Sequence, residues 1–267
     1  MPKCQILLTN DDGIKSPGLW AAAESLSELG YVTVVAPREQ SSGMGRSLPN
    51  TSDGIIQEER LQIKGQDWPV YAVGGTPAQA VLHGILEVMP QKPDIIVSGI
   101  NYGENLGTGI TISGTVGAAM EAAALGFCSL AVSLETAQEH HLTYSREVDF
   151  STAAHFTLQF ARFLLEKSPF PDVDLLKIDV PRDATPDTPW MLTRLAKQRY
   201  YYPVAPTRKS WSVPGTVGYR EAADLKEEAH DSDVFVLRQM RQVSVTPISL
   251  DMTSRVDFGE MKQSFRI

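Results

Sequence analysis

Two neighbouring carboxylates, Asp11 and Asp12, are the residues of this chain best suited to chemistry. They lie in the stretch TNDDGI, directly after the apolar run Gln5–Leu8. Asn, Asp and Gly are ordinary turn residues, so a solvated turn is one interpretation. Adjacent carboxylates also raise each other's pKa unless a cation lies between them. Since the donors are oxygens, the cation that suits such a pair is Mg²⁺, Mn²⁺ or Ca²⁺.

A second polar stretch follows the next apolar run. It lies in the segment VVAPREQSSGMGRS, which begins at Val34 with the last residues of that run. Ser41 or Ser42 could complete a metal shell or contact a phosphate, and Arg46 could contact an anion. A surface loop without function is the alternative. The later stretch GGTPAQAVLHGI places Thr76 and Pro77 where a helix begins, and capping alone explains that pair.

The longest glycine-rich stretch is SGINYGENLGTGITISGTVGAAMEAAALG, from Ser98 to Gly126. Asn101 and Asn105 can offer amide oxygens to a metal or hydrogen bonds to a substrate. The start of the following helix offers hydroxyl groups and free N–H groups as a phosphate cradle, from Ser113, Gly114 and Thr115. The alternative is that the glycines serve only turn geometry. The stretch is neither a Walker A motif nor a G-x-G-x-x-G fingerprint.

Apolar runs alternate with helix-like stretches through the first part of the chain. Strands are predicted at Gln5–Thr9, Val32–Ala36, Val70–Val73, Ile95–Ser98, Ser129–Leu134 and Leu175–Val180. Helices are predicted at Gly18–Leu29, Pro77–Met89, Thr115–Leu125 and Asp149–Lys167, with a hairpin near residues 54–73. This alternation indicates a doubly wound, mostly parallel, Rossmann-like α/β sheet, in which ligands bind outside the carboxyl ends of the strands.

The pattern changes beyond about residue 181. We therefore predict an α/β catalytic core over residues 1–185 and a C-terminal extension over residues 186–267. The extension is rich in Pro, Thr and Tyr, and its short strand-like pieces are Trp211–Tyr219, Asp233–Leu237 and Val243–Thr246. Such a β-rich, extended segment has little core of its own, so we expect it to serve oligomerisation by packing on another subunit.

Composition limits the partners of the 267-residue chain. It is 42% hydrophobic and 21% charged, which suits a folded protein with a sizeable core. A net charge of -8 without a Lys/Arg run argues against a nucleic-acid polymer or an anionic membrane as partner. Cys4 and Cys128 are too few for a disulfide framework, and no signal peptide or membrane span is evident, so we expect a cytoplasmic protein.

Histidine chemistry has little support in this sequence. None of the five histidines shows metal-ligand spacing, which argues against zinc and against a His-based nucleophilic mechanism. His140 and His141 lie in a polar stretch and are predicted to be solvated, and His83 and His155 to be structural.

Together these stretches resemble the SurE family of stationary-phase survival proteins. The matching pieces are ILLTNDDGI, VVAPREQSSGMGRS, GGTPAQAV, PDIIVSGINYGENLGTGITISGTVGAAMEA and the late VSVTPI. The resemblance implies a metal-dependent phosphatase that acts on nucleoside 5′- and 3′-monophosphates, in some members also on short polyphosphate. It implies one divalent cation per subunit, Mg²⁺ or Mn²⁺, with Ca²⁺ as a substitute in crystals. It also implies a homodimer or homotetramer with exchanged C-terminal segments.

The same resemblance implies roles for individual residues. Asp11, Asp12 and Asn101 would be catalytic, and the metal ligands would be Asp11, Asp12, Ser42 and Asn101. Because Ser41 and Ser42 are adjacent, either serine could be the ligand. The phosphate-binding region would comprise Asn10, Asn105, Ser113, Gly114 and Thr115.

Two positions depart from the family pattern. Ser41 stands where an Arg is common, so Arg38 or Arg46 could replace a missing basic contact, and Ile112 stands where an aromatic residue or His is frequent. Two other classes fit less well. A haloacid-dehalogenase-type phosphatase needs Asp-x-Asp, and a receiver-like domain needs an acceptor Asp and a Lys at the ends of later strands. A nucleotide-binding or regulatory module without turnover stays open.

Overall fold

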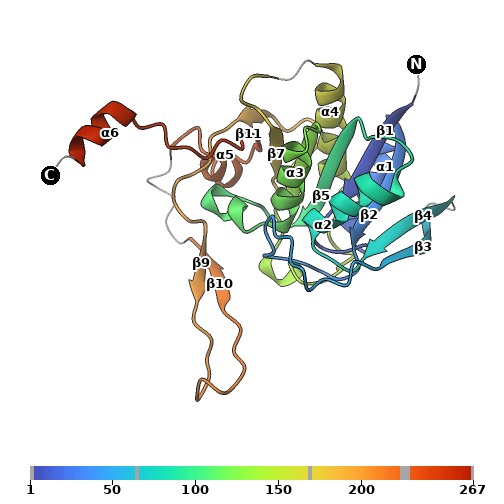
Figure 1. Cartoon of the computed structure of the whole chain (residues 1–267), viewed down its shortest axis with the longest axis horizontal. Helices are drawn as coiled ribbons and strands as arrows, with labels where there is room; N and C mark the ends of the chain where they lie inside the picture. Colours follow the sequence, from blue (N-terminus) through green and yellow to red (C-terminus); the bar gives the residue numbers. More distant parts are fainter. Residues whose placement is uncertain (1–2, 64–65, 168–169, 223–228, 266–267) are drawn as a thin grey trace.

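A nine-stranded, mostly parallel sheet with helices on both faces forms the centre of the molecule (Figure 1). The structure is a computed structural model that describes residues 3–63, 66–167, 170–222 and 229–265, to which every count refers. The central strands, all paired in parallel, are β1 (Cys4–Thr9), β2 (Gly30–Pro37), β4 (Gln66–Val73), β5 (Ile95–Tyr102), β6 (Ser129–Leu134) and β7 (Leu175–Val180). The predicted doubly wound α/β fold is confirmed.

The chain changes its direction of travel across the sheet between β1 and β5. The strand order is β3-β4-β2-β1-β5-β6-β7-β11-β8, so the chain runs outward from β1 through β2 and then returns to the other side of β1. Ligands bind outside the carboxyl ends of strands at such a switch point. Asp11 and Asp12 follow β1 there, and Asn101 lies near the end of β5.

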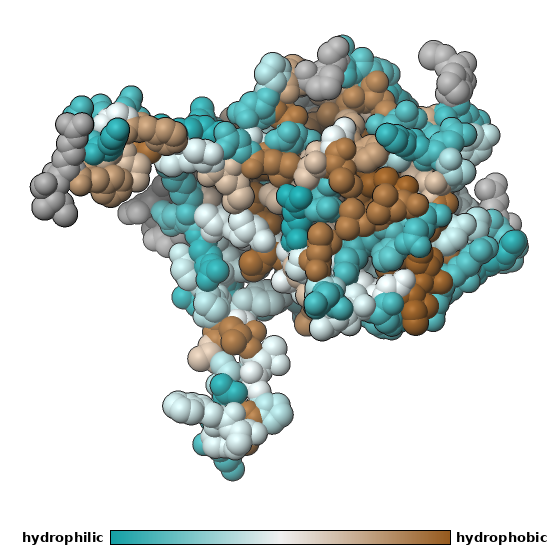
Figure 2. Space-filling model, viewed as in Figure 1, coloured by the Kyte–Doolittle hydropathy of each residue, from teal (hydrophilic) through white to brown (hydrophobic). Residues whose placement is uncertain are grey.

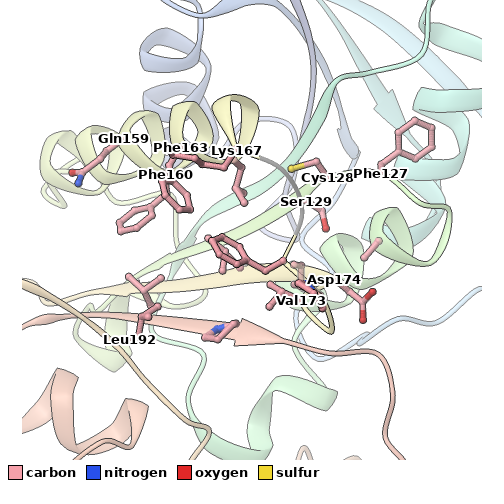
Figure 3. Close-up of a pocket in the computed structure, with 18 of the residues that line it drawn as sticks. Phe127, Cys128, Ser129, Gln159, Phe160, Phe163, Lys167, Val173, Asp174 and Leu192 are labelled. Carbon is pink, nitrogen blue, oxygen red and sulfur yellow. The ribbon is translucent and has the colours of Figure 1, made fainter.

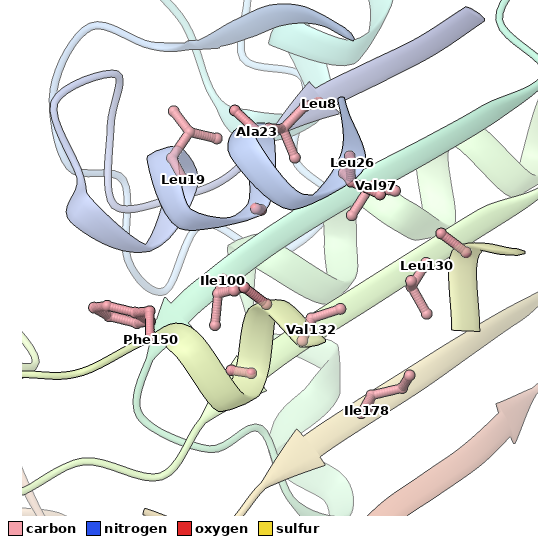
Figure 4. Packing of buried hydrophobic residues seen from close by; sticks show 14 of the residues in the cluster. Leu8, Leu19, Ala23, Leu26, Val97, Ile100, Leu130, Val132, Phe150 and Ile178 are labelled. Carbon is pink, nitrogen blue, oxygen red and sulfur yellow. The ribbon is translucent and has the colours of Figure 1, made fainter. Parts of the chain in front are cut away.

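Two pairs of helices cover the sheet, one pair on each face. The helices are α1 (Pro17–Leu26) and α4 (Ser151–Glu166) on one face, and α2 (Pro77–His83) and α3 (Gly114–Ala124) on the other. Figure 4 shows the first layer, where Leu26 of α1 lies close to Val97 of β5. Because both faces of the central strands are covered, these strands are apolar on both sides.

One helix differs in length from its prediction. The helix predicted over Pro77–Met89 ends as an α-helix at His83 and continues as a wider π-helical turn over Gly84–Val88. Thr76 caps its start, as its side chain accepts a hydrogen bond from the N–H of Gln79. No helix within the described ranges is long and apolar enough to cross a membrane. A cytoplasmic location stays a prediction.

Antiparallel pairs close the two sides of the sheet. β3 (Ile56–Ile63) pairs with β4, which confirms the hairpin predicted near residues 54–73, although its residues 64–65 lie outside the described chain. On the other side, β11 (Val243–Ile248) lies between β7, with which it is antiparallel, and β8 (Trp190–Leu192). The segment after residue 185 therefore supplies two strands to the main sheet.

Other parts of the C-terminal segment stand out from the body of the molecule. The hairpin of β9 (Tyr201–Val204) and β10 (Gly218–Glu221) projects away from the sheet, and so does α6 (Phe258–Ser264) (Figure 1). Figure 2 shows apolar residues on both projections. Trp211 is 93% exposed and Phe258 is 64% exposed.

Two predictions in the C-terminal segment are wrong. Asp233–Leu237 is not extended but lies in the helix α5 (Asp233–Arg238). Its apolar residues resemble a strand, yet Ser232 caps a helix by accepting the N–H of Phe235 at 3.2 Å. Within Trp211–Tyr219 a strand begins only at Gly218, after the Pro214–Gly215 turn signal. The strand predicted at Val243–Thr246 is confirmed.

Candidate active site

The turn after β1 brings both aspartates to the carboxyl edge of the sheet. The Asn10 side chain closes this turn, because its Oδ1 accepts the Gly13 N–H at 3.1 Å and its Nδ2 donates to the Gly13 carbonyl at 3.2 Å. Gly13 has φ of +97°, which glycine adopts readily. Asn10 is fully buried, so its amide serves the turn, and the phosphate contact implied for it stays a prediction.

Uncharged donors hold the two carboxylates. Thr115 donates its hydroxyl to Oδ1 of Asp11 at 2.5 Å, and the backbone N–H of Tyr102 donates to Oδ2 of Asp12 at 3.2 Å. Gln40 donates to the other oxygen of Asp12 at 3.3 Å. Within the described residues, no Lys, Arg or His forms an ion pair with either aspartate.

Burying two carboxylates without a cationic partner disfavours their charged forms. Burial raises the pKa of Asp11, and burial together with the charge of Asp11 raises the pKa of Asp12 well above its ordinary value. A cation between them would remove this penalty. No group of three or more His, Cys, Asp and Glu side chains that could hold a metal occurs in the described part of the chain. Any metal here must therefore draw on amide or hydroxyl oxygens as well.

Asn101 offers such an oxygen. The pairing of β5 with β6 shifts register between Ser98 and Asn101, and irregularities of this kind re-aim a side chain. The amide nitrogen of Asn101 donates to the carbonyl of Gly103 at 2.6 Å and of Tyr102 at 3.3 Å. Its Oδ1 has no hydrogen-bond partner among the described residues, so it suits a hard cation.

The two candidate serines differ in their surroundings. Ser42 is exposed and lines the same pocket as Asp11 and Asn101. Ser41 is buried, and its hydroxyl donates to the carbonyl of Glu39 at 3.2 Å. Its backbone N–H donates to the carbonyl of Asp11 at 2.7 Å, which fixes the loop beside the aspartates. Of the two serines only Ser42 lines the pocket, and its role as a metal ligand stays a prediction.

The start of α3 lies directly against Asp11. Ser113 lines the pocket and caps the helix, since its Oγ accepts the N–H of Val116 at 3.1 Å. A Cβ on Gly114 would lie 2.7 Å from the Cβ of Asp11, so only glycine fits this close approach. Thr115 is fully buried and acts on Asp11 through its hydroxyl. The site therefore combines an acidic corner with a helix start.

The pocket at the switch point has a volume of about 440 Å³. Asp11, Ser42, Asn101, Asn105 and Ser113 all line it. Its only Lys or Arg in the described chain is Arg199, which the sequence patterns did not reveal.

The two arginines considered as substitute phosphate contacts have other partners. Arg38 pairs with Asp53 at 3.0 Å, and Arg46 pairs with Glu121 at 2.6 Å. Neither arginine lines the pocket.

A larger cavity of about 730 Å³ lies at the opposite ends of β6 and β7 (Figure 3). Apolar side chains dominate its wall, with Phe160 and Phe163 of α4 on one side. Lys167 and Asp174 are its charged lining residues in the described chain. This larger cavity lacks a carboxylate pair. The smaller pocket is therefore the better candidate for chemistry.

A buried ion network supports the pocket from behind. Lys177 and Asp179 alternate with apolar residues in β7, and both are fully buried with Asp233 of α5. The Lys177 ammonium pairs with both carboxylates and donates to the carbonyl of Asn105 at 2.9 Å. Asp179 accepts the N–H of Asn105 at 2.7 Å, and Asp233 accepts the N–H of Gly107 at 2.9 Å. The network thus fixes the loop that carries Asn105.

The side-chain amide of Asn105 has a partner of its own, since it donates to the hydroxyl of Ser133 on β6 at 2.7 Å. The sequence prediction treated β7 only as a buried strand. The two charges at alternate positions within LLKIDV were the available signal.

Glu104 gives the pocket a pH-dependent stability. Burial raises its pKa from the ordinary 4.5 to about 7, and its Oε1 accepts the hydroxyl of Tyr201 at 2.9 Å. A carboxyl group whose pKa is higher in the folded state favours folding at low pH, and this advantage is lost as pH rises from 4.5 through 7.

We expect Glu104→Gln to be about 3 kcal/mol more stable than the parent at pH 8 and equal to it at pH 4.5. Gln keeps an acceptor for Tyr201 but never carries the buried charge. Urea unfolding of both proteins at the two pH values measures this difference. Equal stability at pH 8 would show that Glu104 ionises normally.

A doubly wound α/β fold with a polar pocket at its switch point is typical of enzymes that bind a ligand outside the carboxyl ends of their strands. A family model described as "Survival protein SurE" matches residues 6–202. The chain belongs to the SurE family.

Curated relatives and a solved structure agree with this assignment. The chain is 44% identical to the protein named 5′-nucleotidase SurE of Thermococcus gammatolerans, over 97% of this chain and 94% of that protein. It is 41% identical to the protein of the same name from Methanosarcina mazei, over 97% of each. The crystal structure of the SurE protein from Aquifex aeolicus superposes with a TM-score of 0.72 at 31% identity, covering 98% of both chains.

Proposed function

We propose that this protein is a metal-dependent phosphomonoesterase that removes phosphate from nucleoside 5′- and 3′-monophosphates, and also from short polyphosphate. The observation that carries the proposal is the pair of buried carboxylates, Asp11 and Asp12, which lack a cationic partner among the described residues. Relatives at 41–44% identity are named 5′-nucleotidase, which supports a nucleotide as substrate.

The donor set supports one divalent cation per subunit, Mg²⁺ or Mn²⁺. Asp11, Asp12, Ser42 and Asn101 would hold it with oxygen atoms, in keeping with the preference of hard cations. When bound, such a cation neutralises phosphate charge and lowers the pKa of a bound water. Asp11 lines the pocket whereas Asp12 does not, which supports Asp11 as the aspartate that acts on the attacking group.

The phosphate oxygens need donors as charge redistributes in the transition state. Ser113 can donate its hydroxyl, since its oxygen already accepts a hydrogen bond from the helix. Asn105, which lines the pocket, is a further proposed contact. The N–H groups at Gly114 and Thr115 are proposed contacts as well, and they also face the Asp11 carboxylate, which Thr115 fixes through its hydroxyl. Arg199 at the pocket wall adds positive charge.

Phosphate release from a nucleotide panel tests the proposal. We expect AMP and 3′-AMP to release phosphate with Mn²⁺, and EDTA to abolish the release until Mn²⁺ is restored. Binding of AMP without phosphate release under all metal conditions would instead identify a nucleotide-binding module without turnover.

The chain is also proposed to form a homodimer or homotetramer through its C-terminal segment. The projecting α6 supports this, because Phe258, Met261 and Phe265 expose apolar surface that a monomer leaves in water. β11 belongs to the main sheet, so the segment to remove begins after Leu250. Light scattering after size exclusion should give a smaller mass for the shortened chain than for the whole chain. An unchanged mass would contradict the proposal.

A further inference from the structure

Two chemically different sets of side chains line the pocket. Asp11 and Ser113 belong to the polar set described above. The aromatic set consists of Tyr201 and Tyr219 of the β9–β10 hairpin and of His141. A phosphate group needs only the polar set, which leaves the aromatic set for the remainder of the substrate.

The side chains of the aromatic set are held in place by contacts with one another. The rings of His141 and Tyr219 lie nearly parallel, with centroids 6.1 Å apart, and Tyr201 meets Tyr219 edge-on at 5.2 Å. The ring nitrogen Nδ1 of His141 lies 2.9 Å from the Tyr219 hydroxyl. Gln138 donates to the carbonyl of Tyr219 at 3.0 Å, which ties the hairpin to the body.

His141 was predicted to be solvated with His140, and this prediction is wrong. Only 9% of His141 is exposed, because the hairpin covers it. Burial lowers the pKa of its imidazole, so the ring is neutral at pH 7 and suits an aromatic wall. No local sequence pattern predicts that Tyr201 and Tyr219 lie against this histidine.

We propose that this aromatic set forms the nucleobase subsite of the pocket, an inference that rests on the proposed function. Flat rings stack well on aromatic side chains, and stacking tolerates any base because every base has a π-face. The hydroxyl groups of Tyr201 and Tyr219 are engaged with Glu104 and His141. They therefore do not read the base edge, and the subsite prefers purines over pyrimidines by ring area.

Ribose 5-phosphate tests the subsite, because it has the sugar and phosphate of AMP but no base. We expect the wild-type KM for ribose 5-phosphate to exceed that for AMP by about tenfold or more, the range found for base stacking. Tyr219→Ala should lower the ratio of kcat/KM for AMP to that for ribose 5-phosphate by a similar factor. Tyr219→Phe should keep the ratio, since it retains the ring.

Tyr202 provides a matched control on the same hairpin. It is half-exposed, stacks under Arg220 and does not line the pocket, so Tyr202→Ala should leave the ratio unchanged. Equal kcat/KM for AMP and ribose 5-phosphate in the wild type would overturn the inference without any variant. An equal loss on both substrates in Tyr219→Ala would also overturn it. Failure of the wild type to hydrolyse either substrate would instead refute the proposed function.

Discussion

Asp11→Asn is expected to lower kcat/KM for AMP with Mn²⁺ by about 10³-fold or more, because it removes one charge from the pair that holds the cation. Asn has the same shape as Asp and retains an acceptor for Thr115. The folded protein should not lose stability without metal, since the substitution removes a buried charge that lacks a cationic partner.

Steady-state kinetics and thermal unfolding of the variant measure both parts of this prediction. Asp187→Asn is the matched control, because Asp187 is an exposed carboxylate in a connection between strands and should retain full activity. If Asp11→Asn kept its activity within tenfold, Asp11 could not be a metal ligand or a catalytic group.

Lys177→Met is expected to destabilise the protein by about 3–5 kcal/mol, because it leaves Asp179 and Asp233 as buried charges without a partner. Burial would lower the pKa of the Lys177 ammonium, but the two carboxylates outweigh burial and hold it above its ordinary value. The ammonium is therefore charged at neutral pH.

Urea unfolding measures the loss, and Thr246→Val is the matched control. Thr246 lies opposite Lys177 on β11 and loses only a hydroxyl contact with Thr193 at 2.8 Å, for which we expect about 1 kcal/mol. Adding Asp179→Asn and Asp233→Asn to Lys177→Met should restore part of the stability, since no unpaired charge remains. A loss below 1 kcal/mol for Lys177→Met alone would show that the network is not the main support of the Asn105 loop.

The first half of the fold could be predicted because its signals are local. Runs such as VTVVA and DIIVS are apolar at every position but one or two, which predicts strands of a parallel sheet covered on both faces. The acidic pair follows the first of these runs, and ligand sites lie at the carboxyl ends of such strands. The structure places Asp11, Ser42 and Asn101 in one pocket, although their roles stay predictions.

What could not be predicted depends on contacts between distant parts of the chain. Asp233 reaches Gly107 across 126 positions, and Tyr219 meets His141 across 78 positions. In neither pair does the local sequence around one residue predict its contact with the other. The helix α5 was mistaken for a strand because its apolar run is short, and short runs do not distinguish the two periods.

Crystals soaked in Mn²⁺ test the central claim most directly, because manganese has an anomalous X-ray signal that locates it. We predict one strong peak per subunit, within coordination distance of carboxylate oxygens of Asp11 and Asp12 and of the amide oxygen of Asn101, with Ser42 beside it. A map without a peak at this corner, with both carboxylates directed into solvent, would contradict the account.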